Sequence, residues 1–245
     1  MSRIKFLNTE VDNLTMKEAI QKIDELASNK KPSYVVTPNV DHIVKIESDN
    51  EFKQVYNEAD LILTDGMPLI WISKLKGSPI KEKVSGSDLF PEVCKLAAEK
   101  GYKIFLLGAA EGVAAKAAVN LKLKFNGLNI VGTYSPSYGF EKSLDEINNI
   151  ISIINKSKPD ILAVGLGAPK QEKFLYKFKE RLNVPVSLAI GASIDFEAGN
   201  INRAPKWMQN SGLEWLYRLL KEPKRMFKRY LIDDINIIKL IIKYR

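Results

Sequence analysis

The chain has 245 residues, of which 45% are hydrophobic, so it can bury a large core as a globular protein. Its single cysteine, Cys94, and single histidine, His42, exclude a disulfide framework, a thiolate metal cluster and a histidine-rich metal site. The N-terminus lacks a long apolar core, and no stretch approaches the roughly 18 apolar residues of a membrane span, so we expect a cytoplasmic protein without a signal peptide.

The net charge of +8 gathers near the C-terminus. Residues 196–245 contain 11 Lys and Arg against 5 Asp and Glu, a balance of +6, whereas residues 1–195 contain 26 against 24. The strand-like pattern also stops near residue 196, and only helix-like basic segments follow. We therefore predict a body over residues 1–195 and a helical basic appendage over residues 196–245.

Along the body, apolar segments typical of buried strands alternate with amphipathic helices. The first helix is expected over "TMKEAIQKIDELA", where Thr15 and Glu18 have capping-box spacing, and Ser143 and Glu146 repeat that spacing before a later helix. Gly101 has the position of a helix C-cap. Strands are expected in "SYVVTPNV", "ADLILTDG", "YKIFLLG", "LNIVGTY", "DILAVG" and "VPVSLAIGASIDF". This alternation predicts the α/β class, with a mostly parallel, Rossmann-like sheet covered by helices on both faces.

Polar or small residues follow four of these strands: Thr37 and Asn39, then Asp65, then Gly108, then Gly165–Gln171. The carboxyl ends of strands in a doubly wound sheet lie at one edge, where ligands bind, so we expect these residues to converge. Asp65 lies between a strand and "GMPLIW", which has the pattern of a helix start. That position suits both a helix N-cap and a functional carboxylate, and the local pattern leaves the two open.

The segment "GLGAPKQE" combines a glycine-rich turn with a helix start. Gly165 and Gly167 let the backbone approach a ligand, Pro169 can open the helix, and Gln171 and Glu172 fall in its first turn. Free backbone N–H groups at such a helix start suit a phosphate or diphosphate. An ordinary tight turn between a strand and a helix has the same local pattern.

Three common motifs are missing from the sequence. Gly108 and Gly112 are too far apart for the G-x-G-x-x-G fingerprint, which argues against an NAD(P)-dependent oxidoreductase, and there is no P-loop signature. Asp-x-Asp, frequent in metal-dependent sugar transferases, is also missing. We interpret Asp195–Glu197 as the end of a strand and Asp233–Asp234 as the solvated side of a helix. We predict no metal and no cofactor.

The appendage segment "GLEWLYRLLKEPKRMFKRYLIDD" interleaves basic residues with aromatic residues and leucines, and Pro223 is expected to separate two helices. Such a pattern suits an anionic membrane surface. A helical hairpin packed on the body with a solvated basic face has the same pattern. Nucleic-acid binding would also explain the positive charge, but charge confined to the appendage favours a membrane.

Six segments occur in an order that matches a known family: "TPNVDHIV", "ADLILTDGMPLIW", "VSGSDL", "FLLGAAEGVA", "VGLGAPKQE" and "GASIDFEAGNINRAPKWMQNSGLEWLYRLLKEPKRMFKRY". Over nearly its whole length the chain resembles the WecG/TagA/CpsF glycosyltransferase family. The resemblance implies a UDP-sugar donor, an acceptor N-acetylglucosamine linked to a polyprenyl diphosphate, and inversion at the anomeric carbon without a metal.

The resemblance further implies transfer of N-acetylmannosamine from UDP-N-acetylmannosamine to the 4-hydroxyl of N-acetylglucosamine on undecaprenyl diphosphate, a step in wall teichoic acid linkage-unit synthesis. Relatives with N-acetylmannosaminuronic acid or hexose donors leave the donor sugar open. A lipid-linked acceptor implies an enzyme associated peripherally with the inner face of the cell membrane, and not with nucleic acid. The appendage over residues 196–245 is then expected to associate with the membrane and to be able to complete the active site. Neither the residues nor the resemblance fix the oligomeric state, a homo-oligomer included.

The resemblance also implies roles for individual residues. Asp65 matches the family's proposed catalytic base. Lys83 stands where an arginine is expected, which keeps the positive charge but loses the planar bidentate fork. The other candidates are the donor or substrate-binding residues Thr37, Asn39, Gly108, Gly167 and Gln171, and the residues expected to contact the acceptor diphosphate or the membrane, Arg218, Arg225 and Lys228.

Overall fold

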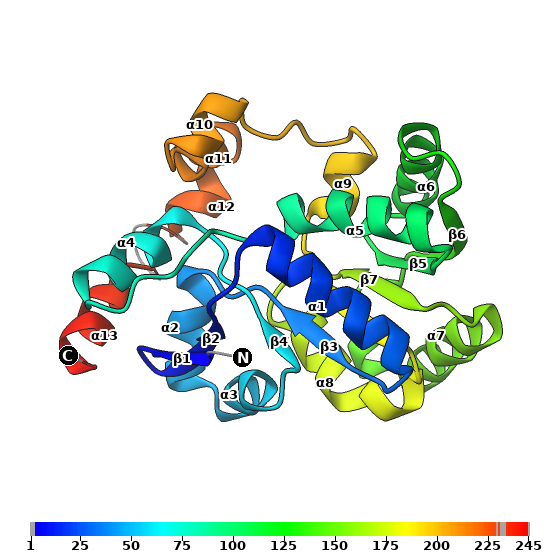
Figure 1. Cartoon of the computed structure of the whole chain (residues 1–245), viewed down its shortest axis with the longest axis horizontal. Helices are drawn as coiled ribbons and strands as arrows, with labels where there is room; N and C mark the ends of the chain where they lie inside the picture. The colour runs from blue at the N-terminus through cyan, green and yellow to red at the C-terminus, as the bar shows by residue number, and fades with distance from the viewer. Residues whose placement is uncertain (1–2, 229, 231–233, 245) are drawn as a thin grey trace.

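The computed structural model describes residues 3–228, 230 and 234–244, with only the backbone of Asn210 and Arg225 (Figure 1). Its main sheet has six strands in the order β4-β3-β8-β7-β5-β6, and all neighbouring strands pair in parallel. The strands are β3 (Tyr34–Val36), β4 (Leu61–Ile62), β5 (Lys103–Gly108), β6 (Asn129–Tyr134), β7 (Ile161–Gly165) and β8 (Val186–Ala189). The predicted parallel, Rossmann-like α/β fold is confirmed.

Helices cover both faces of this sheet. One layer contains α1 (Met16–Asn29), α5 (Gly86–Lys100), α6 (Val113–Lys124) and the short α9 (Ser193–Glu197). The other contains α2 (Val40–Ser48), α3 (Asn50–Asn57), α4 (Met67–Leu75), α7 (Leu144–Ser157) and α8 (Lys170–Leu182), with the 3-10 turn η1 (Phe140–Lys142). The strands are therefore buried on both sides, which explains why they appear in the sequence as continuous apolar runs.

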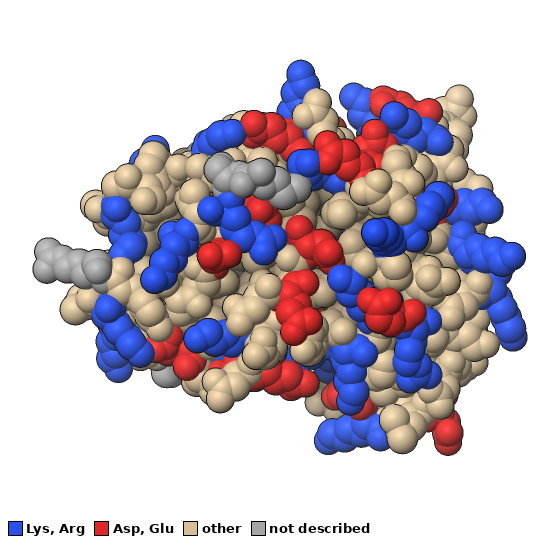
Figure 2. Space-filling model, turned by 60° about the horizontal axis from the view of Figure 1, so that its bottom comes forward, with Lys and Arg blue, Asp and Glu red and all other residues tan. Residues whose placement is uncertain are grey.

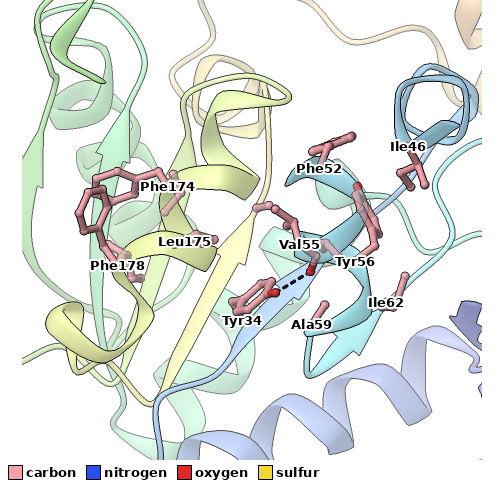
Figure 3. Close-up of a cluster of buried hydrophobic side chains, with 14 of the residues drawn as sticks. Tyr34, Ile46, Phe52, Val55, Tyr56, Ala59, Ile62, Phe174, Leu175 and Phe178 are labelled. Atoms are coloured by element: carbon pink, nitrogen blue, oxygen red, sulfur yellow. Dashed lines mark hydrogen bonds between the residues drawn. The ribbon is translucent and has the colours of Figure 1, made fainter. Parts of the chain in front are cut away.

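Alternate residues of each strand enter opposite core layers. On β3, Val35 packs into the layer of α1, α5 and α6, whereas Tyr34 and Val36 pack into the layer of α2, α3 and α8. Figure 3 shows part of the second layer, where the Tyr34 hydroxyl donates a hydrogen bond to the carbonyl oxygen of Val55 at 2.5 Å. This bond satisfies a polar group that is buried in the core and ties α3 to the sheet.

Local signals predicted some features correctly and others incorrectly. Thr15 and Glu18 form a complete capping box at α1, and Gly101 ends α5 in the left-handed conformation. The second capping box is only half formed. Ser143 accepts the Glu146 N–H, but the Glu146 carboxylate accepts hydrogen bonds from Ser137. The side chain of Glu146 therefore closes the preceding loop and does not return to its own helix.

Two further predictions were wrong. Asp195 does not end a strand, because residues after β8 turn directly into α9, where Ile194 packs into the core. Asp234 does not solvate a helix, because it is buried in the 3-10 turn η3 (Asp234–Asn236), while Asp233 lies outside the described residues. The separate antiparallel hairpin of β1 (Arg3–Phe6) and β2 (Thr9–Asp12) was not predicted from the sequence.

The residues that follow α9, from 198 onward, are called the tail below. They form α10 (Lys206–Asn210), α11 (Glu214–Lys221), α12 (Pro223–Lys228) and α13 (Ile237–Lys243), and Pro223 begins a new helix as predicted. Figure 1 shows these helices, in orange and red, gathered around α4. At the far end, Lys243 and Tyr244 reach Glu47 of α2 at 2.6 and 3.0 Å. The described tail thus packs on the body.

The proposed boundary at residue 195 falls inside α9, which packs against α5 and α6. The division into body and appendage stays a prediction. None of the helices in the described ranges has the length and apolar character needed to cross a bilayer.

The face at the bottom of Figure 1 carries charges of both signs. Figure 2 shows this face with lysine and arginine side chains set among aspartates and glutamates. Lys173 pairs with Asp49 and Glu51 at 2.7 Å each, and Lys179 pairs with Asp60 at 3.0 Å. Such pairing leaves little uniform positive field here for a polyanion.

Candidate active site

Asp65 lies where the loops after β3 and β4 meet. Its backbone N–H donates a hydrogen bond to the carbonyl oxygen of Pro38 at 2.8 Å, which joins the ends of the two strands. The N-cap of α4 is Gly66, and α4 has no side-chain cap. The interpretation of Asp65 as a helix cap is therefore wrong, and its carboxylate is left available for another role.

The Asp65 side chain lines a cavity of about 480 Å³ between the body and the tail. From the body come the polar residues Asn39 and Lys83, and from the tail come Glu214 and Arg218. The rest of the wall is largely apolar and includes Met67, Trp71, Trp215, Ile235, Ile237 and Ile238. Neither part of the chain encloses this cavity alone.

The tail approaches the body closely at one backbone position. A Cβ on Gly212 would lie 3.0 Å from side-chain atoms of Met67 and Trp71 on α4, and Gly212 has a φ of +76°. Only glycine fits both the conformation and the space. This contact sets the distance between α4 and the start of α11.

Five charged side chains of alternating sign connect the two parts beside the cavity. Lys83 pairs with Asp88 at 2.9 Å, and Asp88 pairs with Arg203 at 2.8 Å. The Arg203 Nε lies 3.5 Å from Glu214, which in turn pairs with Arg218 at 3.2 Å. Asp88, Arg203 and Glu214 were not among the residues predicted from the sequence. Only the Glu214–Arg218 spacing, one helical turn, gave a local sign of a pair.

These charges bear directly on Asp65. The pKa of its carboxyl is raised to about 6, mainly by burial and then by the charge of Glu214, while Arg218 and Lys83 oppose the shift and Asp88 adds to it. For Asp88 itself, burial would raise the pKa, but hydrogen bonds from Arg203, Ser85 and Lys83 hold it well below its usual range. A carboxylate with a pKa close to neutral is suited to accept a proton in a reaction.

The remaining candidates after β3 have different surroundings. Asn39 lines the cavity and also caps α2, because its side chain accepts the His42 N–H at 3.3 Å. That capping role was not anticipated, although Asn is a preferred cap. Thr37 is buried at the end of β3 and is not among the lining residues.

Gly108, Gly167 and Gln171 are not among the residues that line this cavity either. A Cβ on Gly108 would lie 2.3 Å from the Gly165 carbonyl oxygen, so glycine is needed where β5 and β7 end side by side. Gln171 is buried, donates to Glu172 at 2.7 Å and accepts the Gly191 N–H at 3.2 Å. In this structure the Gln171 amide joins the start of α8 to the loop after β8, and its contact with a diphosphate stays a prediction.

The three cations predicted in the tail have different positions, and the structure describes the side chains of two of them. Arg218 is half-buried in the cavity wall, with its guanidinium 5.5 Å from the centre of the Phe196 ring. Arg225 belongs to α12, a different helix, and its side chain lies outside the described residues. Lys228 is exposed at the end of α12. In the described part of the chain, no group of three or more His, Cys, Asp or Glu could hold a metal ion, and metal independence stays a prediction.

Comparison with known proteins decides the family. A sequence profile described as "Glycosyl transferase WecG/TagA/CpsF family" matches residues 4–245. The chain belongs to the WecG/TagA/CpsF family. The resemblance found in the sequence is thereby confirmed, and the match includes the tail.

Among WecG/TagA/CpsF relatives, a protein of Bacillus spizizenii is 31% identical over 244 residues, covering 100% of this chain and 90% of its own. A protein of Bacillus subtilis strain 168 is 33% identical over 183 residues, 75% of this chain and 69% of its own. A protein of Staphylococcus aureus strain MW2 is 26% identical over 227 residues, 92% of this chain and 87% of its own. All three are named N-acetylglucosaminyldiphosphoundecaprenol N-acetyl-beta-D-mannosaminyltransferase.

Proposed function

We propose that this protein transfers N-acetylmannosamine from UDP-N-acetylmannosamine to the 4-hydroxyl of N-acetylglucosamine on undecaprenyl diphosphate, in building the wall teichoic acid linkage unit. The names of the relatives support the acceptor and the sugar. The observation that carries the proposal is Asp65, a carboxylate with a raised pKa in a cavity that also contains the cations Lys83 and Arg218.

In the proposed reaction, the acceptor hydroxyl attacks the anomeric carbon of the donor sugar. The bond from this carbon to the acceptor oxygen forms as its bond to the β-phosphate oxygen of UDP breaks. The Asp65 carboxylate takes the hydroxyl proton, and UDP leaves with the electron pair. Attack opposite the leaving group inverts the anomeric centre, so one base is sufficient.

Two diphosphates meet in this reaction, one on the donor and one on the acceptor. Lys83 and Arg218 contribute positive charge to the cavity. We propose that Lys83 stabilises the leaving UDP, with Thr37, Asn39 and Gln171 on the donor side, and that Arg218, Arg225 and Lys228 contact the acceptor diphosphate. Lys83 already pairs with Asp88 at 2.9 Å, so it acts as a point charge and not as a bidentate fork.

The surface around the cavity supports membrane attachment. Exposed apolar side chains project from α4 and from the tail helices gathered beside it: Leu75, Trp207, Leu220, Phe227 and Ile242. Exposed lysines lie on the same helices, including Lys74, Lys221 and Lys228. Apolar side chains with basic neighbours bind an anionic lipid surface. We propose that this side rests on the inner face of the cell membrane.

A donor panel tests the proposed function. The full chain is assayed for UDP release and for the disaccharide product, with a soluble lipid-diphosphate N-acetylglucosamine acceptor and one UDP-sugar at a time. We expect UDP-N-acetylmannosamine to give the highest kcat/KM. A clear preference for a uronic acid or hexose donor would assign a different surface polysaccharide. No transfer from any UDP-sugar would reject the proposal.

A further inference from the structure

Arg203 is a contact between the tail and the body next to the candidate active site. It lies in the segment between α9 and α10, ahead of all the tail helices. Its guanidinium Nη1 lies 2.8 Å from the Asp88 carboxylate and 3.4 Å from the Ser87 carbonyl oxygen, both on α5. Its Nε faces Glu214 at the start of α11. One side chain thus joins α5 to α11.

We propose that Arg203 is a positioning residue for sugar transfer: by bridging Asp88 to Glu214, it holds α11, with Glu214 and Arg218, beside Asp65. This inference rests on the proposed function and adds a residue that does not line the Asp65 cavity. Arg203 acts through Glu214 and Arg218, and does not touch the reacting atoms.

The surroundings of Arg203 indicate that it fixes the position of α11 more than it stabilises the fold. Its Nε and Nη2 are buried and make no hydrogen bond to any described residue. Leaving donors of a buried charged group without hydrogen bonds costs free energy, so a buried ion pair adds little net stability compared with apolar packing. What the pair provides is a fixed geometry between two carboxylates on different elements.

The geometry of α11 explains why a shift there would matter. Glu214 and Arg218 line the Asp65 cavity and also a neighbouring cavity of about 290 Å³, so they form the wall between the two. Arg203 lines the second cavity only. If the bridge to Asp88 is lost, the wall keeps the Gly212 contact with α4 and the contact of Arg218 with the Phe196 ring, but Glu214 loses its link to α5. Misplacing a positioning group by about 1 Å can cost roughly 100-fold in rate.

Arg203→Gln removes the charge and keeps much of the side-chain volume. We expect kcat for sugar transfer to fall roughly 10- to 100-fold while UDP binding changes little. Lysine can reach one carboxylate but not both, so the kcat of Arg203→Lys should lie between those of Arg203→Gln and the unmodified chain. The matched control is Arg181→Gln, at an exposed arginine on α8 whose side chain contacts Asn148. It should transfer sugar like the unmodified chain.

A second readout does not depend on activity. Backbone hydrogen exchange, followed by mass spectrometry on the full chain, should speed up in residues 206–221 of Arg203→Gln and stay unchanged in α8. Arg203→Gln with unchanged kcat and unchanged exchange would overturn the inference, and so would loss of kcat with faster exchange throughout the body. If the unmodified chain transfers no sugar but Arg203→Gln still loosens residues 206–221, the proposed function fails and the tail contact stands.

The pH profile tests whether α11 lies beside Asp65, as the inference requires. The charged and titratable groups around Asp65 are Glu214 and Arg218 on α11, Lys83 before α5, Asp88 on α5 and Tyr56 on α3, with Tyr230 and Asp234 in the wall of the same cavity. Glu214→Gln removes a negative charge that raises the pKa of Asp65, so the midpoint of the acidic limb should move below about 6. An unshifted midpoint would show that α11 does not lie beside Asp65, and would overturn the inference.

Discussion

The sheet-bearing body and the tail are held by different forces. In the body, helices cover both faces of a parallel sheet, and the two core clusters bury long runs of apolar side chains. The described tail buries few: Ala198, Ala204, Met208, Met226 and Leu240. Beside the cavity, ion pairs and the Gly212 contact join it to the body, and α13 packs Ile237 and Leu240 on one of the body's core clusters.

Because of this difference, stability comes mainly from the body, whereas the chemistry of the site depends on both parts. Apolar burial dominates folding free energy, so the body supplies most of the stability. The charges around Asp65 come from both parts, since Lys83 and Asp88 belong to the body and Glu214 and Arg218 to the tail. We therefore expect changes in the tail to affect sugar transfer more than folding, and changes in the core to do the reverse.

The largest effect is expected from the proposed base. Asp65→Asn keeps the size of the side chain but cannot accept the proton, so turnover should fall by roughly 10²–10⁴-fold. UDP binding, measured by calorimetry, should change little. Asp145→Asn, at an exposed aspartate on α7, is the matched control. Near-normal turnover of Asp65→Asn would remove Asp65 from the mechanism.

The next effect concerns Arg218 and sharpens the contrast between body and tail. Arg218→Glu places a negative charge beside Glu214, where a diphosphate is expected, so transfer should fall by roughly 10²-fold. Donor binding and the Tm should stay close to those of the unmodified chain. Arg218→Lys should have an intermediate transfer rate, because lysine keeps the positive charge but lacks the planar guanidinium that binds a phosphate with two hydrogen bonds. Equal losses in transfer and in Tm would show that Arg218 is structural.

A smaller effect is expected on membrane attachment. The full chain should sediment with liposomes that contain anionic lipid, and added salt should weaken this binding. Leu220→Gln removes an exposed apolar side chain of α11 and should weaken binding several-fold. Leu123→Gln, at a leucine of α6 in the body that is more exposed still, should leave binding unchanged. Equal effects of the two substitutions would argue against a membrane face built by the tail.

The smallest effect is on body stability and depends on pH. Burial raises the pKa of Glu172, which is fully buried on α8, to about 7 from a usual value of 4.5. The protonated form is therefore favoured in the folded state, and its stabilising contribution is lost as pH rises from about 4.5 through about 7. Glu172→Gln does not titrate, so it should raise the free energy of unfolding by roughly 1–3 kcal/mol at about pH 8. Near pH 4 the two proteins should be alike. Denaturant unfolding at both pH values measures the difference.

Local signals in the sequence predicted the fold and part of the site. The strands are apolar runs buried on both faces, and Thr15, Gly101 and Pro223 act through neighbouring residues only. Asp65 was correctly expected at the end of a strand, because strand ends share one edge of a parallel sheet. These features depend on interactions within a few residues or on a general rule of the fold.

The rest depends on contacts between distant segments. Arg203 meets Asp88 and Glu214 only because the tail returns to α5, and no residue spacing encodes that return. Glu146 was expected to cap its own helix, but its carboxylate instead accepts hydrogen bonds from Ser137 in the preceding loop. Arg218 was expected near the substrate, but the other tail residues in the wall of the Asp65 cavity could not be predicted for the same reason.

The most direct test of the account is the pH dependence of sugar transfer by the full chain. If Asp65 is the base, kcat should rise with pH through a midpoint near 6, as its carboxyl loses the proton. In Asp65→Asn this rise should disappear and a slow, pH-independent rate should remain. A rise with the same midpoint in Asp65→Asn would contradict the account, because another group would then be accepting the proton.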